Sequence, residues 1–204
     1  MVKVIGAGLA GCEAAWQLSK QGIEVQLYEM KPKKYTPAHK SPKFGELVCS
    51  NSLRASGIEN AVGLLKEEMR RLGSLIMECA DISATPAGGA LAVDRELFSQ
   101  LVTDKIKSNP RIAVINEEVV SVPDDGEVII ASGPLTSDAL AECIAKKLGE
   151  EYLSFFDAAA PIVTFDSLDM NHAFFASRYD KGTPDYINCP MGREQYLAFY
   201  HELC

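Results

Sequence analysis

Residues 2–18 read VKVIGAGLAGCEAAWQL, and this stretch decides the fold. Val2–Ile5 is a short apolar run typical of a buried strand, and the glycines behind it follow the pattern GxGxxG. Small and apolar residues then recur at helical spacing as far as Gly22, a typical helix stop. A second apolar run begins near residue 24 and ends at Glu29. This order of strand, glycine turn, helix, strand and acid predicts a unit that binds a dinucleotide.

Each glycine of the pattern has its own expected task. Gly6 permits the tight turn, Gly8 lets the backbone approach a pyrophosphate, and Gly11 lets the helix and the strand pack closely. The helix N-terminus offers amide groups to the phosphates, and Glu29 can accept hydrogen bonds from ribose hydroxyls. The residues expected at the dinucleotide are Gly6, Ala7, Gly8, Leu9, Ala10, Gly11 and Glu29. The alternative is an accidental run of glycines.

The rest of the chain predicts further helices and strands. One amphipathic helix is expected over residues 60–77, with Val62, Leu65, Met69, Leu72 and Ile76 facing inward. Residues 85–91 are expected to form a loop, and a helix is expected to begin near Asp94 with Leu97, Leu101, Val102 and Ile106 inward. A strand is predicted at 112–115, and a pair of strands at 119–122 and 128–131 around the Asp-Asp-Gly turn. A last helix runs from Ser137 to Gly149.

These elements predict an α/β fold in two parts. Residues 1–150 form a Rossmann-like domain, with a mostly parallel sheet, helices on both faces and a small antiparallel ribbon. From residue 150 aromatic residues become frequent and short strand-like runs alternate with polar turns. Residues 151–204 are therefore expected to begin an inserted α+β domain.

Composition narrows the class of protein. The chain has 204 residues, of which 47% are hydrophobic, and no apolar run approaches the roughly 20 residues of a membrane span. The strand at the N-terminus leaves no room for a signal peptide, so a cytoplasmic location is expected and no membrane is. The six cysteines include no CxxC pair and no zinc-like spacing, so free thiols and no metal site are expected. The net charge of −8 argues against nucleic-acid binding over the whole surface, but leaves room for a local basic patch.

A second glycine turn favours FAD as the dinucleotide. Residues 128–134, VIIASGP, are a strand that ends in small residues and a glycine. Flavoproteins with two dinucleotide domains often carry a similar turn, where the backbone meets the FAD again; the alternative is a plain strand-to-loop glycine. Ser132, Gly133 and Val119 are expected cofactor contacts. Arg95, at a predicted helix start, is either a solvated charge or a cation that stabilises an anionic flavin or a phosphate.

Two further stretches could carry chemistry. Residues 31–43 hold five lysines, three prolines and no acid, which indicates either a solvated loop or a loop that contacts nucleic-acid phosphates. Residues 46–54, ELVCSNSLR, place Cys49 where an apolar run meets small polar residues. Cys49 is either a reactive thiol, activated by a cation or a helix N-terminus, or a structural cysteine.

Together these motifs resemble one enzyme family. GAGLAGCEAAWQL, YEMKPKKYTPAH, FGELVCSNSLR, AVGLLKEEM, PAGGALAVDRELF, INEEVV, ASGPLTS, DAAAPIV and SRYDKG are similar to the folate- and FAD-dependent tRNA (uracil-5-)-methyltransferases of bacteria. The resemblance runs from residue 2 to at least residue 191. The large subunit of the wobble-uridine modification enzyme shares the glycine loop and AGCEAA, but ELVCSNSLR and PAGGALAVDR fit the methyltransferase better.

The resemblance implies a function and a set of residues. Such enzymes carry a one-carbon unit from methylenetetrahydrofolate to carbon 5 of the T-loop uridine, with reduced FAD as reductant and NAD(P)H to restore it. Cys49 would be catalytic at the flavin side of the site, where it attacks uracil, shields the flavin or handles the carbon unit. The residues expected to contact tRNA are Lys31, Lys33, Lys34, Lys40, Lys43 and Arg54.

The resemblance also implies a longer protein. Members of the family continue well beyond residue 204, so this chain is expected to be an N-terminal portion that lacks the segment closing over the flavin and a second catalytic cysteine. It is expected to bind FAD weakly, or to be inactive, by itself. Two other functions stay open: a flavin oxidoreductase acting on a small molecule, and a non-catalytic fragment that binds a nucleotide or tRNA.

Overall fold

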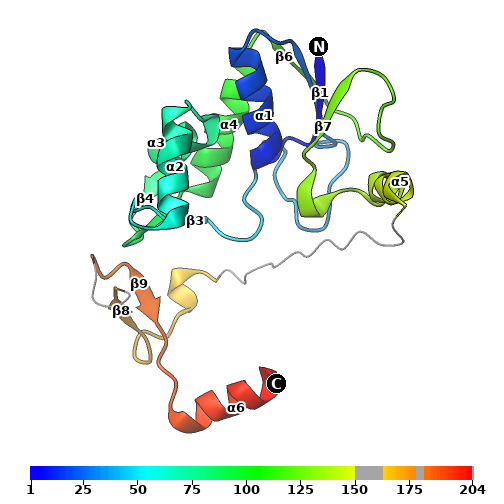
Figure 1. The fold of residues 1–204 in the computed structure, drawn as a ribbon. Helices are drawn as coiled ribbons and strands as arrows, with labels where there is room; N and C mark the ends of the chain where they lie inside the picture. The colour runs from blue at the N-terminus through cyan, green and yellow to red at the C-terminus, as the bar shows by residue number, and fades with distance from the viewer. Residues whose placement is uncertain (150–162, 178–181, 204) are drawn as a thin grey trace.

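The computed structural model of the chain describes residues 1–149, 163–177 and 182–203. Its centre is a sheet of four parallel strands in the order β6-β2-β1-β7 (Figure 1). The strands are β1 (Val2–Ile5), β2 (Val25–Tyr28), β6 (Ile112–Ile115) and β7 (Glu127–Ile130). The predicted α/β fold and its βαβ unit are confirmed.

The strand order places a crevice beside β1. From β1 the chain moves to β2 and β6 on one side, and later returns to add β7 on the other side. Ile5 pairs in register with Tyr28 and with Ile130, so the carboxyl ends of these strands meet at one edge. In open α/β sheets, ligands bind outside the carboxyl ends of the strands where the strand order reverses.

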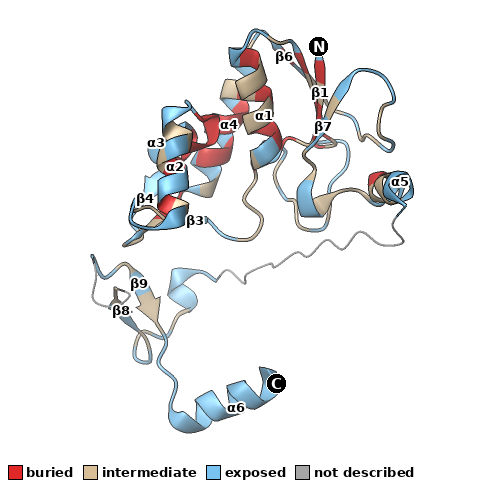
Figure 2. Ribbon diagram, viewed as in Figure 1, coloured by how far each residue is buried: buried red, intermediate tan, exposed pale blue. Residues whose placement is uncertain are grey.

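Helices α1 (Leu9–Lys20), α3 (Leu75–Ile82) and α4 (Arg95–Ser108) build the core together with the sheet. Figure 2 shows the buried residues gathered in these helices and in the strands that they cover. The carboxylate of Glu13 ties α1 to the start of α3, because it accepts hydrogen bonds from the Ser74 hydroxyl at 2.7 Å and the Ile76 amide at 3.0 Å. The last helix of this part is α5 (Asp138–Leu148), which ends at Gly149 in the left-handed conformation, as predicted.

The single helix expected over residues 60–77 is wrong. Two helices occupy this region, α2 (Ala61–Arg71) and α3, and Gly73 separates them with a φ of 68°. Ser74 then caps α3, since its hydroxyl accepts a hydrogen bond from the amide of Met77. Leu65 and Leu72, both expected to face inward, are 54% and 70% exposed. Leu97, also expected inward, is 44% exposed on α4.

The antiparallel ribbon lies elsewhere than predicted. Residues 119–122 form no strand, and the strand after the Asp-Asp-Gly turn, β7, pairs in parallel with β1. The antiparallel sheet is instead β3 (Ser52–Ala55), β5 (Ala90–Val93) and β4 (Ala84–Thr85), in the order β3-β5-β4. Residues 85–91, expected to be a loop, therefore include the end of one strand and the start of another.

The described residues beyond 162 form a short hairpin and a helix. Strands β8 (Phe174–Ala176) and β9 (Tyr186–Asn188) pair antiparallel, and α6 (Arg193–Leu203) has no buried residue. Short 3-10 turns occur at Gly133–Leu135 and Phe165–Ser167. The hairpin meets the turn between β4 and β5, where the Gly88 amide donates to Asp185 and the Tyr186 hydroxyl donates to the Ala87 carbonyl. A domain boundary at residue 150 stays a prediction. Among the described residues, no helix is both long and apolar enough to cross a membrane.

Candidate dinucleotide site

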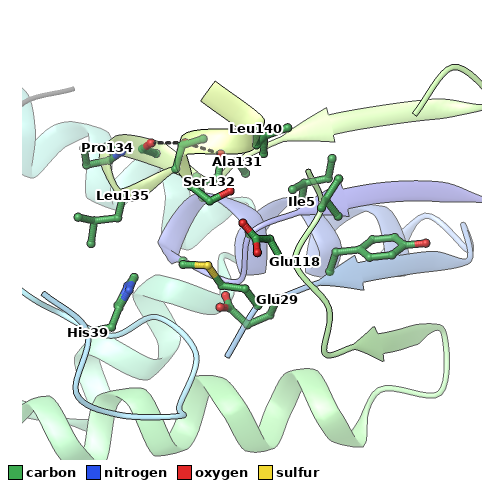
Figure 3. Close-up of a pocket in the computed structure, with 18 of the residues that line it drawn as sticks. Ile5, Glu29, His39, Glu118, Ala131, Ser132, Pro134, Leu135 and Leu140 are labelled. Atoms are coloured by element: carbon green, nitrogen blue, oxygen red, sulfur yellow. Dashed lines mark hydrogen bonds between the residues drawn. The ribbon is translucent and has the colours of Figure 1, made fainter. Parts of the chain in front are cut away.

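A cavity of about 320 Å³ opens at the carboxyl ends of the parallel strands. Figure 3 shows Glu29 and Glu118 at the centre of the view, with His39 and Leu135 both to their left. It is lined by Ile5, Gly6, Gly8, Leu9, Ala10, Tyr28, Glu29, Met30, His39, Glu46, Val48, Glu117, Glu118, Val119, Ala131–Ser137 and Leu140. It therefore occupies the crevice between β1 and β7 that the topology indicates.

The glycine loop forms the floor of this cavity, and its glycines differ in what surrounds them. Gly6 has a φ of 99°, and a β-carbon there would lie 2.8 Å from the Cα of Ser132. A β-carbon on Gly11 would overlap the carbonyl oxygen of Gly6. A β-carbon on Gly8 would meet no atom within 4 Å. Gly6 and Gly11 therefore serve the fold, whereas the space in front of Gly8 is open to a ligand.

The first turn of α1 is suited to an anion. Its N-cap is Gly8, so no side chain accepts a hydrogen bond from the helix amides, and the first turn holds no acidic residue. The partial positive charge of the helix N-terminus is thus left unneutralised by the helix's own residues, which favours a phosphate group. Leu9 and Ala10 line the cavity at this point.

Glu29 is held in place by the backbone. One carboxylate oxygen accepts a hydrogen bond from the Ala7 amide at 2.9 Å, and the other accepts from the Lys31 amide at 3.0 Å. The residue is only 7% exposed, yet it lines the cavity. The two amides fix the carboxylate at the cavity wall, where it can still accept from ribose hydroxyls, since each oxygen has two lone pairs.

Most of the expected dinucleotide residues come together here. Those that line the cavity are Gly6, Gly8, Leu9, Ala10, Glu29, Val119, Ser132 and Gly133. Ala7 and Gly11 lie behind the wall, where both are buried. Val119 lines the cavity from a segment with no regular structure, not from the strand that was predicted for it.

Several lining residues were missed by the sequence analysis. Glu117 and Glu118 follow β6, whose carboxyl end lies level with that of β2. The strand at 112–115 was predicted, so the rule that ligands meet strand ends could have found both acids. His39 and Glu46 come from the lysine-rich segment and the residues after it, and the local pattern gave no signal for either.

The lysines of this segment do not share one environment. Lys31, expected to contact tRNA, is 2% exposed, and its ammonium donates to Glu46 at 3.1 Å and to the Lys43 carbonyl at 2.7 Å. It cannot reach a nucleic acid from there, so that prediction is corrected. Lys33, Lys34 and Lys40 are exposed.

Two of the lysines form ion pairs at the rim. Lys34 pairs with Glu118 at 2.7 Å, and the hydrogen bond from Lys34 holds the pKa of Glu118 below its usual value. Lys43 pairs with Glu96 at 2.6 Å. The Lys34–Glu118 pair links the lysine-rich loop to a residue of the cavity wall.

A second cavity of about 500 Å³ is lined by Arg95 and by Val48, the residue before Cys49. Arg95 lines it and donates a hydrogen bond to the Cys49 carbonyl at 3.2 Å. Glu46 and Val48 line both cavities, so the two adjoin. Arg95 therefore lines the second cavity and not the first. Cys49 is the residue directly after Val48, which lines both cavities.

Metal ligands are not clustered in the part of the chain that the structure describes: it holds no group of three or more His, Cys, Asp or Glu residues arranged to bind a metal ion. The five cysteines that the structure describes form no disulfide bond. Cys204 lies outside the described residues.

Comparison with known proteins agrees with this geometry. The family described as glucose inhibited division protein A matches residues 1–204, which is the full chain. The chain belongs to the glucose inhibited division protein A family.

The chain is also similar to curated relatives with a more specific name. It is 65% identical over 202 residues to the methylenetetrahydrofolate–tRNA-(uracil-5-)-methyltransferase TrmFO of Acetivibrio thermocellus, and 62% identical to that of Desulfitobacterium hafniense. Each alignment covers 99% of this chain and 46% of the relative. The chain thus spans about half the length of the curated relatives it matches.

A solved structure of GidA from Aquifex aeolicus has a similar fold. It superposes with a TM-score of 0.52 at 17% identity, over 65% of this chain and 25% of the other. At this identity the likeness is one of fold alone. The GidA family fold is therefore supported both by sequence and by structure.

Proposed function

We propose that this chain is the dinucleotide-binding part of a folate- and FAD-dependent tRNA (uracil-5-)-methyltransferase. The observation that carries the proposal is the 65% identity to a protein of that name, over a stretch that includes both cavities. The 17% identity to the solved GidA is far lower. The name of the relative indicates tRNA and a folate as the substrates. The geometry of the first cavity supports a dinucleotide cofactor.

The residues present fit FAD. The open space at Gly8 and the uncapped start of α1 suit the pyrophosphate, Glu29 suits the ribose, and Val119 lines the far wall for the adenine. The second cavity, which adjoins the first through Glu46 and Val48, gives room for the remaining half of an extended dinucleotide. Bound FAD would supply the electrons that complete the methyl group, and NAD(P)H would restore it.

Cys49 is the proposed thiol of the reaction. Carbon 5 of uracil becomes nucleophilic when a nucleophile adds to carbon 6, and a thiolate suits that addition. Cys49 is half-buried, it follows Val48 of the second cavity, and its carbonyl accepts a hydrogen bond from Arg95, which lines that cavity. The target base must leave its stack to reach such a site.

The exposed cations Lys33, Lys34, Lys40 and Arg54 are the proposed contacts for tRNA phosphates. Lys43, paired with Glu96, belongs to the same surface. The tRNA substrate implies a cytoplasmic protein, in which residues 151–204 begin a second domain. Reversing the charges of Lys33 and Lys34 tests this surface: weaker retention of tRNA in a gel shift supports it, and unchanged retention favours an oxidoreductase acting on a small molecule.

The first test is the visible absorbance of the purified chain. Flavin bands, present at once or after addition of FAD, support the proposed cofactor, and a protein that stays colourless contradicts it for this chain.

The second test follows labelled carbon from methylenetetrahydrofolate into a tRNA transcript, with NADH and NADPH compared. A transcript that lacks the T-loop uridine is the control, and equal labelling of both transcripts would refute the proposed substrate.

A further inference from the structure

The lysine-rich loop is tied to the glycine loop by a closed ring of hydrogen bonds. The Ala7 amide donates to Glu29 at 2.9 Å, and the opposite oxygen of Glu29 accepts from the Lys31 amide at 3.0 Å. The Lys31 ammonium donates to Glu46 at 3.1 Å. The Gly45 amide then closes the ring, because it donates to the Ala7 carbonyl at 2.9 Å. We call these five residues the Ala7 ring.

The ion pair of the ring is largely buried in the closed arrangement of the loop that the structure shows. The side chain of Lys31 is 3% exposed and that of Glu46 is 13% exposed. Phe44, beside the ring, is buried, and its amide donates to the Thr103 hydroxyl at 2.8 Å. If the two buried charges of Lys31 and Glu46 separated, each would be left without its partner. The closed arrangement of the ion pair is therefore favoured.

Glu46 extends the ring into the lysine-rich loop. Its second oxygen accepts hydrogen bonds from the amides of Lys40 and Ser41, at 2.8 and 3.0 Å. The Lys31 ammonium also reaches the Lys43 carbonyl. One ion pair thus fixes the beginning and the end of the loop that carries the exposed lysines.

The ring also forms part of the cavity wall. Glu29 and Glu46 belong to the ring and line the first cavity, and His39 lines it from within the loop. A dinucleotide in the cavity would touch both ring members and the loop. It would therefore bind more tightly when the loop is closed on the ring, and a ligand with different affinities for two states shifts the population between them.

We propose that Lys31 and Glu46 are positioning residues that couple dinucleotide binding to the tRNA-facing loop. Bound dinucleotide holds the loop closed and presents Lys33, Lys34 and Lys40 in the arrangement that tRNA meets. This inference rests on the proposed function, because it takes FAD and tRNA as the two ligands. By linkage, tRNA raises the affinity for FAD by the same factor as FAD raises the affinity for tRNA.

The test measures coupling, which a merely structural role would not produce. Trypsin cleavage after Lys33, Lys34 and Lys40 is timed with and without saturating FAD, and tRNA affinity is measured under the same two conditions. In the unaltered chain we expect FAD to slow cleavage and to tighten tRNA binding by about fivefold or more, within the usual range of coupling. In Glu46→Gln both effects of FAD fall below about twofold, each measured at an FAD concentration that saturates that variant.

Two further variants keep the outcome clear. Lys31→Met combined with Glu46→Met removes both charges, so it leaves no unpaired buried ion and tests coupling even if Glu46→Gln unfolds. Glu78→Gln, which breaks the distant pair with Lys105, is the charge-matched control and keeps full coupling. Coupling that survives in the double variant overturns the inference. Absence of FAD binding in the unaltered chain overturns the proposed cofactor, and with it the premise of the coupling.

Discussion

Gly11 lies so close to the carbonyl oxygen of Gly6 that a single added carbon on Gly11 would overlap that oxygen. The contact joins the first turn of α1 to the end of β1, and both atoms belong to backbone that cannot rotate away. Gly11→Ala should therefore lower the free energy of unfolding by about 3 kcal/mol or more, as severe overpacking does. Urea unfolding followed by circular dichroism measures the loss.

Gly8→Ala is the matched variant, because the same added carbon meets no atom within 4 Å. Its stability should fall by no more than about 1 kcal/mol, since alanine is a poorer N-cap than glycine but meets no steric clash here. Its affinity for FAD should fall by at least about tenfold, since the methyl group occupies space in front of the helix N-terminus. Unchanged FAD affinity in Gly8→Ala would show that Gly8 has no ligand to make room for.

The two amides that hold Glu29 make its carboxylate a sensitive position. In Glu29→Gln one side-chain oxygen becomes an NH₂ group, which faces either the Ala7 or the Lys31 amide with a donor. Losing a charged hydrogen-bond acceptor should weaken FAD binding by about 10- to 100-fold. Fluorescence titration of FAD measures this, with Glu24→Gln, exposed and paired with Arg111, as the control. Wild-type affinity in Glu29→Gln would remove the ribose contact from the proposal.

The sequence predicts those parts of the site that depend on local patterns of residues. It does not predict the parts that depend on tertiary contacts. The glycine pattern and Glu29 lie within one βαβ unit, so their spacing alone places them. Glu46 meets Lys31 across fifteen positions of an irregular loop, which periodicity cannot detect, and this contact turns an expected surface lysine into a buried one. In the sequence, Gly73 fits one continuous helix. In the structure, its left-handed conformation and the Ser74 cap divide that helix in two.

Arg54 carries backbone strain in an exposed position. Its φ of 68° lies in the left-handed region, and it is the only non-glycine residue with a positive φ among those the structure describes. A side chain in this conformation costs about 1–2 kcal/mol, and glycine avoids that cost but gains entropy when unfolded. Arg54→Gly should thus be as stable as the unaltered chain, or up to about 1 kcal/mol more stable.

The same change should weaken tRNA binding, because it removes one of the cations proposed to contact tRNA phosphates. The salt dependence of tRNA affinity should become shallower by about one unit of slope at most. Arg54→Lys keeps the charge and serves as the control for affinity. A variant that loses stability without losing affinity would assign Arg54 to the fold.

The Lys34–Glu118 pair predicts a pH dependence at the cavity rim. The pKa of Glu118 is lowered in the folded chain, chiefly by the hydrogen bond from Lys34, so the pair stabilises the fold above the ordinary carboxyl pKa. That contribution is lost as the pH falls through the lowered value. Since Lys34 is half-exposed, the effect is at most about 1 kcal/mol. Thermal melts of the unaltered chain and of Glu118→Gln should differ near neutral pH and converge as the pH falls below the lowered pKa of Glu118.

Cys49→Ala separates catalysis from cofactor binding. Cys49 follows Val48, which lines both cavities, and Cys49 itself does not line the first cavity, the proposed site of the dinucleotide. The variant should therefore keep its FAD affinity and lose carbon transfer to tRNA by at least about tenfold, measured in a protein that is active before the change. Cys189→Ala, at an exposed cysteine, controls for loss of a thiol.

Burial raises the pKa of Cys79 to about 11 and that of Cys12 further still, so neither buried thiol can substitute as a thiolate near neutral pH. Full transfer by Cys49→Ala would show that the reaction uses no thiol from ELVCSNSLR.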